Sequence, residues 1–486
     1  MQYLLMLWWM NAVERSGILS VPREYFSLKS LVCMLDTWTA ERAIAFAPDA
    51  NSAKSGRSLA VVHKWPVLGH RSPVIWGECQ GSGKQPYRTQ IDLSEPAFRC
   101  SCPSRKFPCK HGLGLLLLWA ENSEKFTQSA LPDWVAEWLE ARTQRQEQKE
   151  AKQNVRTADP EAQAKRAAAR AHKVDAGVAE LQLWMRDLVR QGLASLANQS
   201  YQYWDSIAAR MVDAQAPGLA RRLRELAGLP HSGAGWPEHL LGELGQLHLL
   251  LEGYHRLKHV PLPVQQDIRT QIGFTQKSEE VLAAAERPAS EVETCRDRWH
   301  VVGQVTESED RLTVQRLWLW GEASQRPALL LQFTPAHLSL EIVAVPGTAF
   351  DAELVFYHSA TPLRAAIKQR KETDVAAGWV DGGTRIGEAI ASYSRALSRN
   401  PWLLRYPLLL AAVTPVRQEG EWWVRDADGF VLSISPRCTK QWQLLALSGG
   451  MPLGLFGEWD GERLLPLGAW ANEQFWPIQN AGGERS

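Results

Sequence analysis

Three cysteines and one histidine lie within twelve residues in the pattern C-x-C-x6-C-x-H, formed by Cys100, Cys102, Cys109 and His111. Thiolate sulfur and imidazole nitrogen are the ligands that structural zinc prefers, four to an ion in a tetrahedron. Packing alone does not explain four such groups at this spacing, and a disulfide between cysteines two residues apart would be badly strained. We expect one zinc ion here. Because four protein ligands leave no position for water, we expect its role to be structural rather than catalytic.

A hairpin and a helix must hold the two ligand pairs in place. Residues 73–79 and 87–93 have strand character and are separated by turn residues at 80–86, which predicts a hairpin. Residues 112–122 are strongly apolar and predict a helix directly after the ligands. Residues 58–68 are β-branched and aromatic and predict a further strand.

The loop between the ligand pairs is bracketed by Pro103 and Pro108, which limit the entropy lost when the loop closes. Its surroundings are basic, with Lys84 and Arg88 in the expected hairpin. The candidate contact residues for a partner or a nucleic acid are Arg99, Arg105, Lys106, Phe107 and Lys110. Such a loop can hold phosphates and stack a base. Alternatively, its cations offset the negative charge of a zinc ion bound by three thiolates, which requires no ligand.

The finger resembles the SWIM zinc finger, and the chain resembles the bacterial SWIM zinc finger family proteins. The likeness is carried by residues 77–120 and 208–229, and it covers the chain from about residue 37 to the C-terminus. It implies zinc binding, with proposed binding of DNA or protein. It also implies an association with MoxR-type ATPases and von Willebrand factor A-type proteins, beside which members of the family are found.

Composition excludes several classes of protein. The 486 residues are 45% hydrophobic and 22% charged, which is typical of a globular chain of about three domains. A net charge of +1 argues against tight non-specific DNA binding. No apolar run approaches the ~20 residues that span a bilayer, so we expect no membrane protein. Seven cysteines fit a reducing compartment, and we expect a cytoplasmic location.

We expect a multidomain α+β fold: a small ββα-like zinc finger unit, a helical middle region and a C-terminal α+β region with antiparallel hairpins. Apolar residues recur at three and four positions through 178–285, whereas the period shifts toward two after Trp299. Within that last region, residues 362–374 and 385–399 predict helices. The expected divisions are an N-terminal extension at 1–36 that reflects a misplaced start, a SWIM zinc finger domain at 37–123, a charged, partly helical linker at 124–177, a helical domain at 178–290 and a Trp-rich α+β domain at 295–486.

A basic segment lies within the expected linker. Residues 142–173 contain nine lysines and arginines against four acidic residues, a net charge of +5. We interpret the segment as a solvated helix, although it could also extend a nucleic-acid surface.

The remaining motifs do not predict catalysis. GSGK at 81–84 lacks the other residues of a phosphate-binding loop. His248, Glu252, His255 and His259 form one stripe of an expected helix, which we interpret as a polar, solvent-facing stripe rather than a metal site. One residue of the pair Trp422–Trp423 is a candidate for a partner surface.

No nucleophile elbow is present, and no small-molecule substrate is indicated. We therefore expect a non-enzymatic adaptor that binds a protein partner, with DNA or RNA binding through the basic loop as the alternative.

Overall fold

The chain divides into two compact parts, Met1–Val135 and Ala136–Ser486, which are described separately. The computed structural model describes residues 38, 40–47, 50–80, 85–94, 97–104, 106–156, 160–287, 292–309, 312–335, 343–371, 375–376, 378 and 380–478. The expected N-terminal extension at residues 1–36 lies outside these ranges.

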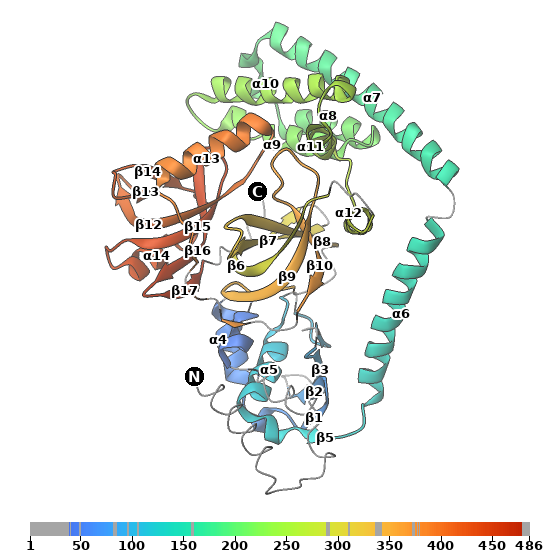
Figure 1. Ribbon diagram of the computed structural model, residues 1–486, viewed down its shortest axis with the longest axis vertical. Coiled ribbons are helices and arrows are strands. Elements are labelled where there is room, and N and C mark those ends of the chain that lie inside the picture. The colour runs from blue at the N-terminus through green and yellow to red at the C-terminus, as the bar shows by residue number, and fades with distance from the viewer. Residues whose placement is uncertain are drawn as a thin grey trace, which may run out of the picture. The chain divides into compact units, whose positions relative to one another are not determined.

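The first part is built on a five-stranded sheet in the order β4-β3-β2-β1-β5 (Figure 1). Strands β2 and β3 form the expected antiparallel hairpin, in register from Val74 opposite Asp92 to Cys79 opposite Tyr87. The elements are α3 (Ala40–Ala45), α4 (Ala50–Leu59), η1 (Val62–Lys64), β1 (Val67–Arg71), β2 (Val74–Cys79), β3 (Tyr87–Asp92), β4 (Ala97–Cys100), α5 (Lys110–Asn122), η2 (Ser123–Lys125) and β5 (Thr127–Gln128).

Helix α5 supplies much of the core of this part. Residues Leu115–Leu118 are fully buried, as their apolar run predicts. Two glycines let α4 approach α5 closely: a Cβ atom on Gly56 would lie 2.8 Å from the Cβ of Leu113, and one on Gly114 would lie 2.8 Å from the Cβ of Leu59. A larger side chain at either position would push the helices apart.

The expected strand at residues 58–68 is wrong for most of its length. Helix α4 continues to Leu59, a short 3₁₀ turn follows, and β1 begins only at Val67. The buried Trp65 indole donates to the Leu59 carbonyl at 2.7 Å, which holds the turn. Tertiary packing of Trp65 and the α4–α5 contact therefore override the β propensity of Val61 and Val62.

The second part begins with helices, as expected for the middle of the chain. Proline starts α9 at Pro217, and the helices enclose a core that includes Trp204, Leu223 and Leu247. The elements are α6 (Asp133–Arg156), which begins in the first part, α7 (Pro160–Gln191), η3 (Leu193–Asn198), α8 (Tyr201–Asp213), α9 (Pro217–Leu226), η4 (Leu229–His231), α10 (Trp236–His255), η5 (Leu257–His259), α11 (Leu262–Ile272) and α12 (Ser278–Ala285). The basic segment at 142–173 is helical in α6 and α7, and residues 157–159 lie outside the described ranges.

Two antiparallel sheets follow the helices (Figure 1). The first has the order β10-β9-β6-β7-β8, with β11 paired to β9. Its strands are β6 (Thr294–Glu309), β7 (Leu312–Gly321), β8 (Pro327–Pro335), β9 (Thr348–Phe356), β10 (Ala365–Arg370) and β11 (Val375–Ala376). Two of the tryptophans of this Trp-rich region, Trp299 and Trp318, are among its buried residues.

The second sheet curls on itself, because β14 pairs with β13 on one side and in parallel with β16 on the other. Its order is β14-β13-β12-β15-β16-β17, and α13 and α14 pack against β12. The elements are β12 (Tyr406–Gln418), β13 (Glu421–Arg425), β14 (Val431–Ile434), β15 (Leu453–Trp459), β16 (Arg463–Ala471), β17 (Gln474–Pro477), α13 (Ile386–Arg399) and α14 (Gln441–Ser448).

The two helices expected in this region have different outcomes. Helix α13 confirms the one at 385–399. The one at 362–374 is wrong: residues 365–370 form β10, and 372–374 lie outside the described ranges. Ala365 and Ala366 favour a helix by propensity, but here they are buried and pair with β9 as part of a strand. Sheet pairing outweighs their local preference.

Candidate metal centre

The four expected zinc ligands come in two pairs, one at the end of β4 and one at the start of α5. Cys100 is the last residue of β4, and Cys102 lies just beyond it in the loop. Cys109 caps the N-terminus of α5, where its sulfur accepts from the Gly112 amide at 3.5 Å. His111 follows in the first turn of the same helix. The sheet edge and the helix start thus bring the two pairs together.

The four ligand atoms fit one tetrahedral ion. All of them lie within 4.8 Å of one another, and the Cys100 Sγ is 3.8 Å from the His111 Nδ1. Zinc–ligand bonds of about 2.0–2.3 Å place tetrahedral ligand atoms about 3.6–3.8 Å apart. Cys109 and His111 are buried, and Cys100 and Cys102 are half-buried. The geometry and the donor set are therefore compatible with one structural Zn²⁺.

Neighbouring groups orient the ligands. The Thr89 hydroxyl donates to the Cys100 sulfur at 3.2 Å. The Tyr87 ring packs on the His111 imidazole, with centroids 4.8 Å apart. Donors to a thiolate stabilise its charge, and packing fixes the ring that must face the metal. The strand pattern predicts Tyr87 and Thr89 as hairpin residues only, without a role at the metal. For Thr89 the signal is strand register, because β3 pairs Thr89 directly with Cys100 of β4.

Without a metal ion, hydrogen bonds among the ligand groups shift the pKa values of Cys100, Cys102 and His111. Hydrogen bonds with Cys102 and Cys109, followed by burial, raise the pKa of Cys100. The hydrogen bond from Cys100 lowers the pKa of Cys102. Burial lowers the pKa of His111, but its contacts with the sulfurs of Cys102 and Cys109 outweigh burial and raise that pKa to about 9. A zinc ion takes the place of these shared protons.

The expected contact residues surround the metal ligands. Arg99, Lys106 and Lys110 are exposed, and Phe107 is half-buried with its ring edge-on to Phe98 at 6.0 Å. Arg105 and the GSGK turn with Lys84 lie outside the described ranges. Their role in contacting a partner stays a prediction.

Arg88 is engaged within the finger itself. Its Nε donates to Glu78 at 3.2 Å, and its guanidinium lies 5.8 Å from the Trp134 ring centroid.

The other motifs form no metal site in the described ranges. Within those ranges, the histidine, cysteine and carboxylate side chains that lie close enough together to hold an ion are those of Cys100, Cys102, Cys109 and His111. Of the predicted stripe, His248, Glu252 and His255 lie on α10, whereas His259 lies in η5. Gln182 of α7 donates to Glu252 at 3.1 Å and lies 3.0 Å from His255.

The tryptophan pair Trp422–Trp423 is less exposed than the nearby Trp442. Trp422 and Trp423 are both half-buried, and Trp422 packs edge-on against the exposed Trp442 at 5.0 Å. A partner surface at this pair stays a prediction.

Comparison with known proteins agrees with the geometry. Residues 87–120 match the SWIM zinc finger family, so the metal centre defines a finger of this class. Residues 169–272 match the SWIM-associated four-helix bundle domain. The chain is thus a multidomain protein in which a SWIM finger and its associated bundle precede two antiparallel sheets. No curated protein and no solved structure matches it.

No helix in the described ranges is both long enough and apolar enough to cross a bilayer.

Proposed function

We propose that this protein is a non-enzymatic adaptor whose zinc-held finger binds a protein partner. The observation that carries the proposal is the closed donor set: four protein ligands within 4.8 Å of one another leave no position for a reacting water. The ion then serves to hold the knuckle rigid. A rigid knuckle costs little conformational entropy when it binds.

The chemistry of the knuckle indicates the partner surface. Arg99, Lys106 and Lys110 are exposed on or beside the loop that joins the ligands. Exposed cations of one sign steer an acidic partner and raise the rate of association. With a net charge of +1 for the whole chain, this local patch, rather than overall charge, gives the selectivity. We propose an acidic surface of a protein partner, and a MoxR-type ATPase system as its source.

The test uses purified full-length chain and a purified MoxR-type ATPase from the same organism. The triple variant Arg99→Ala, Lys106→Ala, Lys110→Ala should weaken association at least about tenfold while zinc content stays at one ion per chain. Lys54→Ala is the matched control, because Lys54 is an exposed lysine on α4 of the same part. An unchanged affinity in the triple variant would show that the finger is not the recognition element. Absence of any complex would remove this partner.

Binding of DNA or RNA is the second candidate, because Phe107 stands among the same cations. Phosphates would contact Lys106 and Lys110, and a base would stack on the ring. Anisotropy with labelled single- and double-stranded oligonucleotides at 50 mM salt tests it. Loss of Lys106 and Lys110 should weaken binding of every sequence and flatten the dependence on salt. No binding at low salt excludes this candidate.

A cytoplasmic location belongs to the same proposal, since free thiols that hold zinc need a reducing compartment. Cell fractionation tests it, and recovery of the protein outside the cytoplasmic fraction would contradict it.

A further inference from the structure

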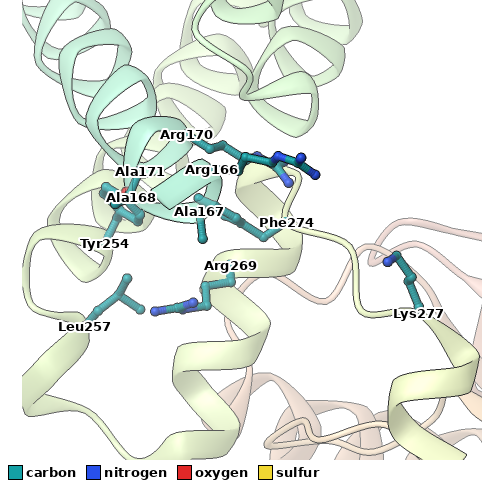
Figure 2. A pocket seen from close by; sticks show the side chains of 10 residues that line it. All are labelled: Arg166, Ala167, Ala168, Arg170, Ala171, Tyr254, Leu257, Arg269, Phe274 and Lys277. Carbon is teal, nitrogen blue, oxygen red and sulfur yellow. The ribbon is translucent and has the colours of Figure 1, made fainter. Parts of the chain in front are cut away.

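A pocket of about 630 Å³ lies among the helices of the second part, away from the zinc ligands in sequence (Figure 2). Its walls come from α7, from the end of α10 and the turn after it, from α11 with the residue Phe274 beyond it, and from Lys277, the residue before α12. The lining residues are Arg166, Ala167, Ala168, Arg170, Ala171, Tyr254, Leu257, Arg269, Phe274 and Lys277. A volume of this size accommodates a ligand of nucleotide dimensions.

The charge of the lining is strongly positive. Four of its side chains are cations and none is a carboxylate. Within the described part of the chain, no ion pair engages Arg166 or Arg269, and Lys277 lies 3.4 Å from Glu280 on the exposed side of α12. Like charges held around one hollow repel each other, so such a site favours an anion.

Arg170 has a donor to spare. Its Nη2 donates to the Gly273 carbonyl at 2.9 Å, which fixes the guanidinium at the pocket. Its Nε is buried and has no hydrogen-bond partner. A buried donor without an acceptor costs free energy, and Arg170 holds this unsatisfied donor next to the pocket lining.

The rest of the lining is apolar and aromatic. The Phe274 ring has the Arg170 guanidinium 4.5 Å from its centroid and that of Arg269 at 5.9 Å. Three alanines of α7 and Leu257 complete the apolar part of the lining. The Tyr254 hydroxyl donates to Asp175 at 2.8 Å, so only its ring is presented to the pocket. The pocket thus combines an apolar wall with a group of cations.

The pocket has two ends that differ in chemistry. Arg166 and Arg170 are four residues apart on one face of α7, and Figure 2 shows their guanidinium groups extending toward the side on which Lys277 lies. Arg269 extends the other way, toward Leu257. One end therefore suits a phosphate group, and the wall between Phe274 and Leu257 suits the body to which it is attached.

The plainer explanation is that the basic segment at 142–173 is a solvated helix. That explanation covers Arg166 and Arg170, which belong to the segment. It does not account for Lys277, which comes from about 100 residues further along the chain and lines the same pocket as Arg166 and Arg170. Convergence of cations from separate elements on one pocket distinguishes a site from a charged helix face.

We propose that this pocket binds an organic phosphate, in which an aromatic or apolar body carries phosphate groups, as in a nucleotide. The phosphates lie among Arg166, Arg170 and Lys277, and the body packs on Phe274 and the alanines of α7. This site is independent of the zinc finger and adds a small ligand to the proposed adaptor.

Calorimetric titration of the zinc-loaded full chain with ATP and GTP at 50 mM salt tests the proposal. One site per chain is expected. The double variant Arg166→Gln, Lys277→Gln should bind at least about tenfold more weakly, since charged hydrogen bonds are lost. Both residues are exposed, so the fold should be kept, and a thermal melt of each variant checks this. Arg190→Gln is the matched control, an exposed arginine on the same helix outside the pocket, and should bind as wild type.

Two further probes separate the parts of the ligand. Adenosine and inorganic tripolyphosphate should each bind at least about tenfold more weakly than ATP, because each lacks half of the recognised chemistry. The proposal is overturned if neither nucleotide binds with a Kd below about 1 mM, which is the affinity of a weak small ligand. It is also overturned if the double variant binds as well as the control, or if tripolyphosphate binds as tightly as ATP. Binding of a dT oligonucleotide alone, tightening with length, would overturn it in favour of a nucleic-acid surface.

Discussion

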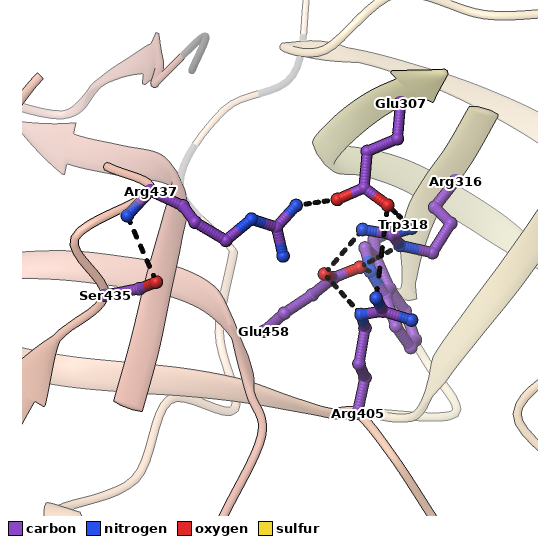
Figure 3. Close-up of polar contacts among 7 residues, drawn as sticks. All are labelled: Glu307, Arg316, Trp318, Arg405, Ser435, Arg437 and Glu458. Atoms are coloured by element: carbon purple, nitrogen blue, oxygen red, sulfur yellow. Dashed lines mark hydrogen bonds and ion pairs between the residues drawn. The ribbon is translucent and has the colours of Figure 1, made fainter. Parts of the chain in front are cut away.

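Arg316 and Glu458 form a two-point ion pair across the two C-terminal sheets. The Arg316 Nε donates to Glu458 Oε1 at 2.7 Å and its Nη2 donates to Oε2 at 3.1 Å, although 142 residues separate the two. Arg316 lies on β7 and Glu458 on β15, and their side chains are 5% and 3% exposed. Figure 3 shows Glu307, Arg405 and Arg437 completing the cluster, and the Trp318 indole also donates to Glu458, at 2.8 Å.

Breaking this pair should destabilise the C-terminal sheets strongly. Burial would raise the pKa of Glu458, but the charges of Arg316 and Arg405 and the hydrogen bonds from Arg316 and Trp318 outweigh it and lower that pKa. Replacement of Arg316 by Met leaves a buried carboxylate short of its main partner. The free energy of unfolding should fall by about 3–5 kcal/mol. Urea unfolding followed by tryptophan fluorescence measures the change.

The control for that variant is an exposed ion pair. Arg210 and Glu180 are 2.8 Å apart with side chains 57% and 50% exposed, so Arg210→Met should cost less than about 1 kcal/mol. If Arg316→Met and Arg210→Met lose the same unfolding free energy, burial does not make the Arg316–Glu458 pair more stabilising than an exposed pair.

Asp267 should make stability depend on pH in the opposite sense to an ordinary paired carboxylate. Its Oδ2 accepts from the Ala360 amide at 2.8 Å, which ties α11 to the turn after β9. Burial raises the pKa of Asp267 to about 6, and hydrogen bonds from Ser359 and Ala360 only partly offset this. The folded state therefore holds a proton that the unfolded state has lost. This contribution is fully present below about pH 4, the unfolded pKa, and is lost as pH rises through 6.

The variant Asp267→Asn isolates this effect, because an amide keeps an acceptor oxygen and does not ionise. Between pH 4 and pH 7 the unfolding free energy of wild type should fall by about 2–3 kcal/mol relative to the variant. Chemical denaturation of both proteins at several pH values gives the difference. A difference that does not change with pH would contradict the buried, protonated carboxylate.

Loss of a zinc ligand should unfold the finger and leave the second part folded. Cys102→Ser should reduce zinc from one ion per chain to near zero, and the amide protons of β3, β4 and α5 should then exchange rapidly. Metal binding in such sites supplies ~10–16 kcal/mol in model peptides, which is more than a small unit holds otherwise. Metal analysis and hydrogen exchange measure the two effects. Cys295→Ser, at a half-buried thiol of β6, is the control and should keep its zinc.

Zinc uptake should release protons, and affinity should rise with pH. In the metal-free finger the pKa of His111 is about 9 and that of Cys100 is raised, so both groups are protonated at neutral pH. Zinc must displace both protons, and affinity should change about tenfold per released proton for each pH unit. Titration calorimetry in buffers of different ionisation enthalpy counts the protons. An affinity that is the same at pH 6 and pH 8 would refute this protonation scheme.

Local sequence rules predicted the elements in which local and tertiary preferences agree. The C-x-C-x6-C-x-H spacing predicted the ligands because zinc chemistry restricts both residue type and separation. The apolar period predicted the helices of the middle region, and the hairpin before the ligands followed from alternation. The rules were wrong at Val61–Val62 and at Ala365–Ala366, where a neighbouring helix or strand edge outweighed propensities of less than about 1 kcal/mol per residue.

The sequence by itself determined the metal, its four ligands and the α+β class, since those depend on chemistry and periodicity within short segments. Only the tertiary structure decided which distant residues meet. Thr89 reaches Cys100 through strand register, Arg316 reaches Glu458 across two sheets, and Arg166 shares a pocket with Lys277. These contacts span from 11 to 142 residues, and no local period encodes them, because they arise from how separate elements pack.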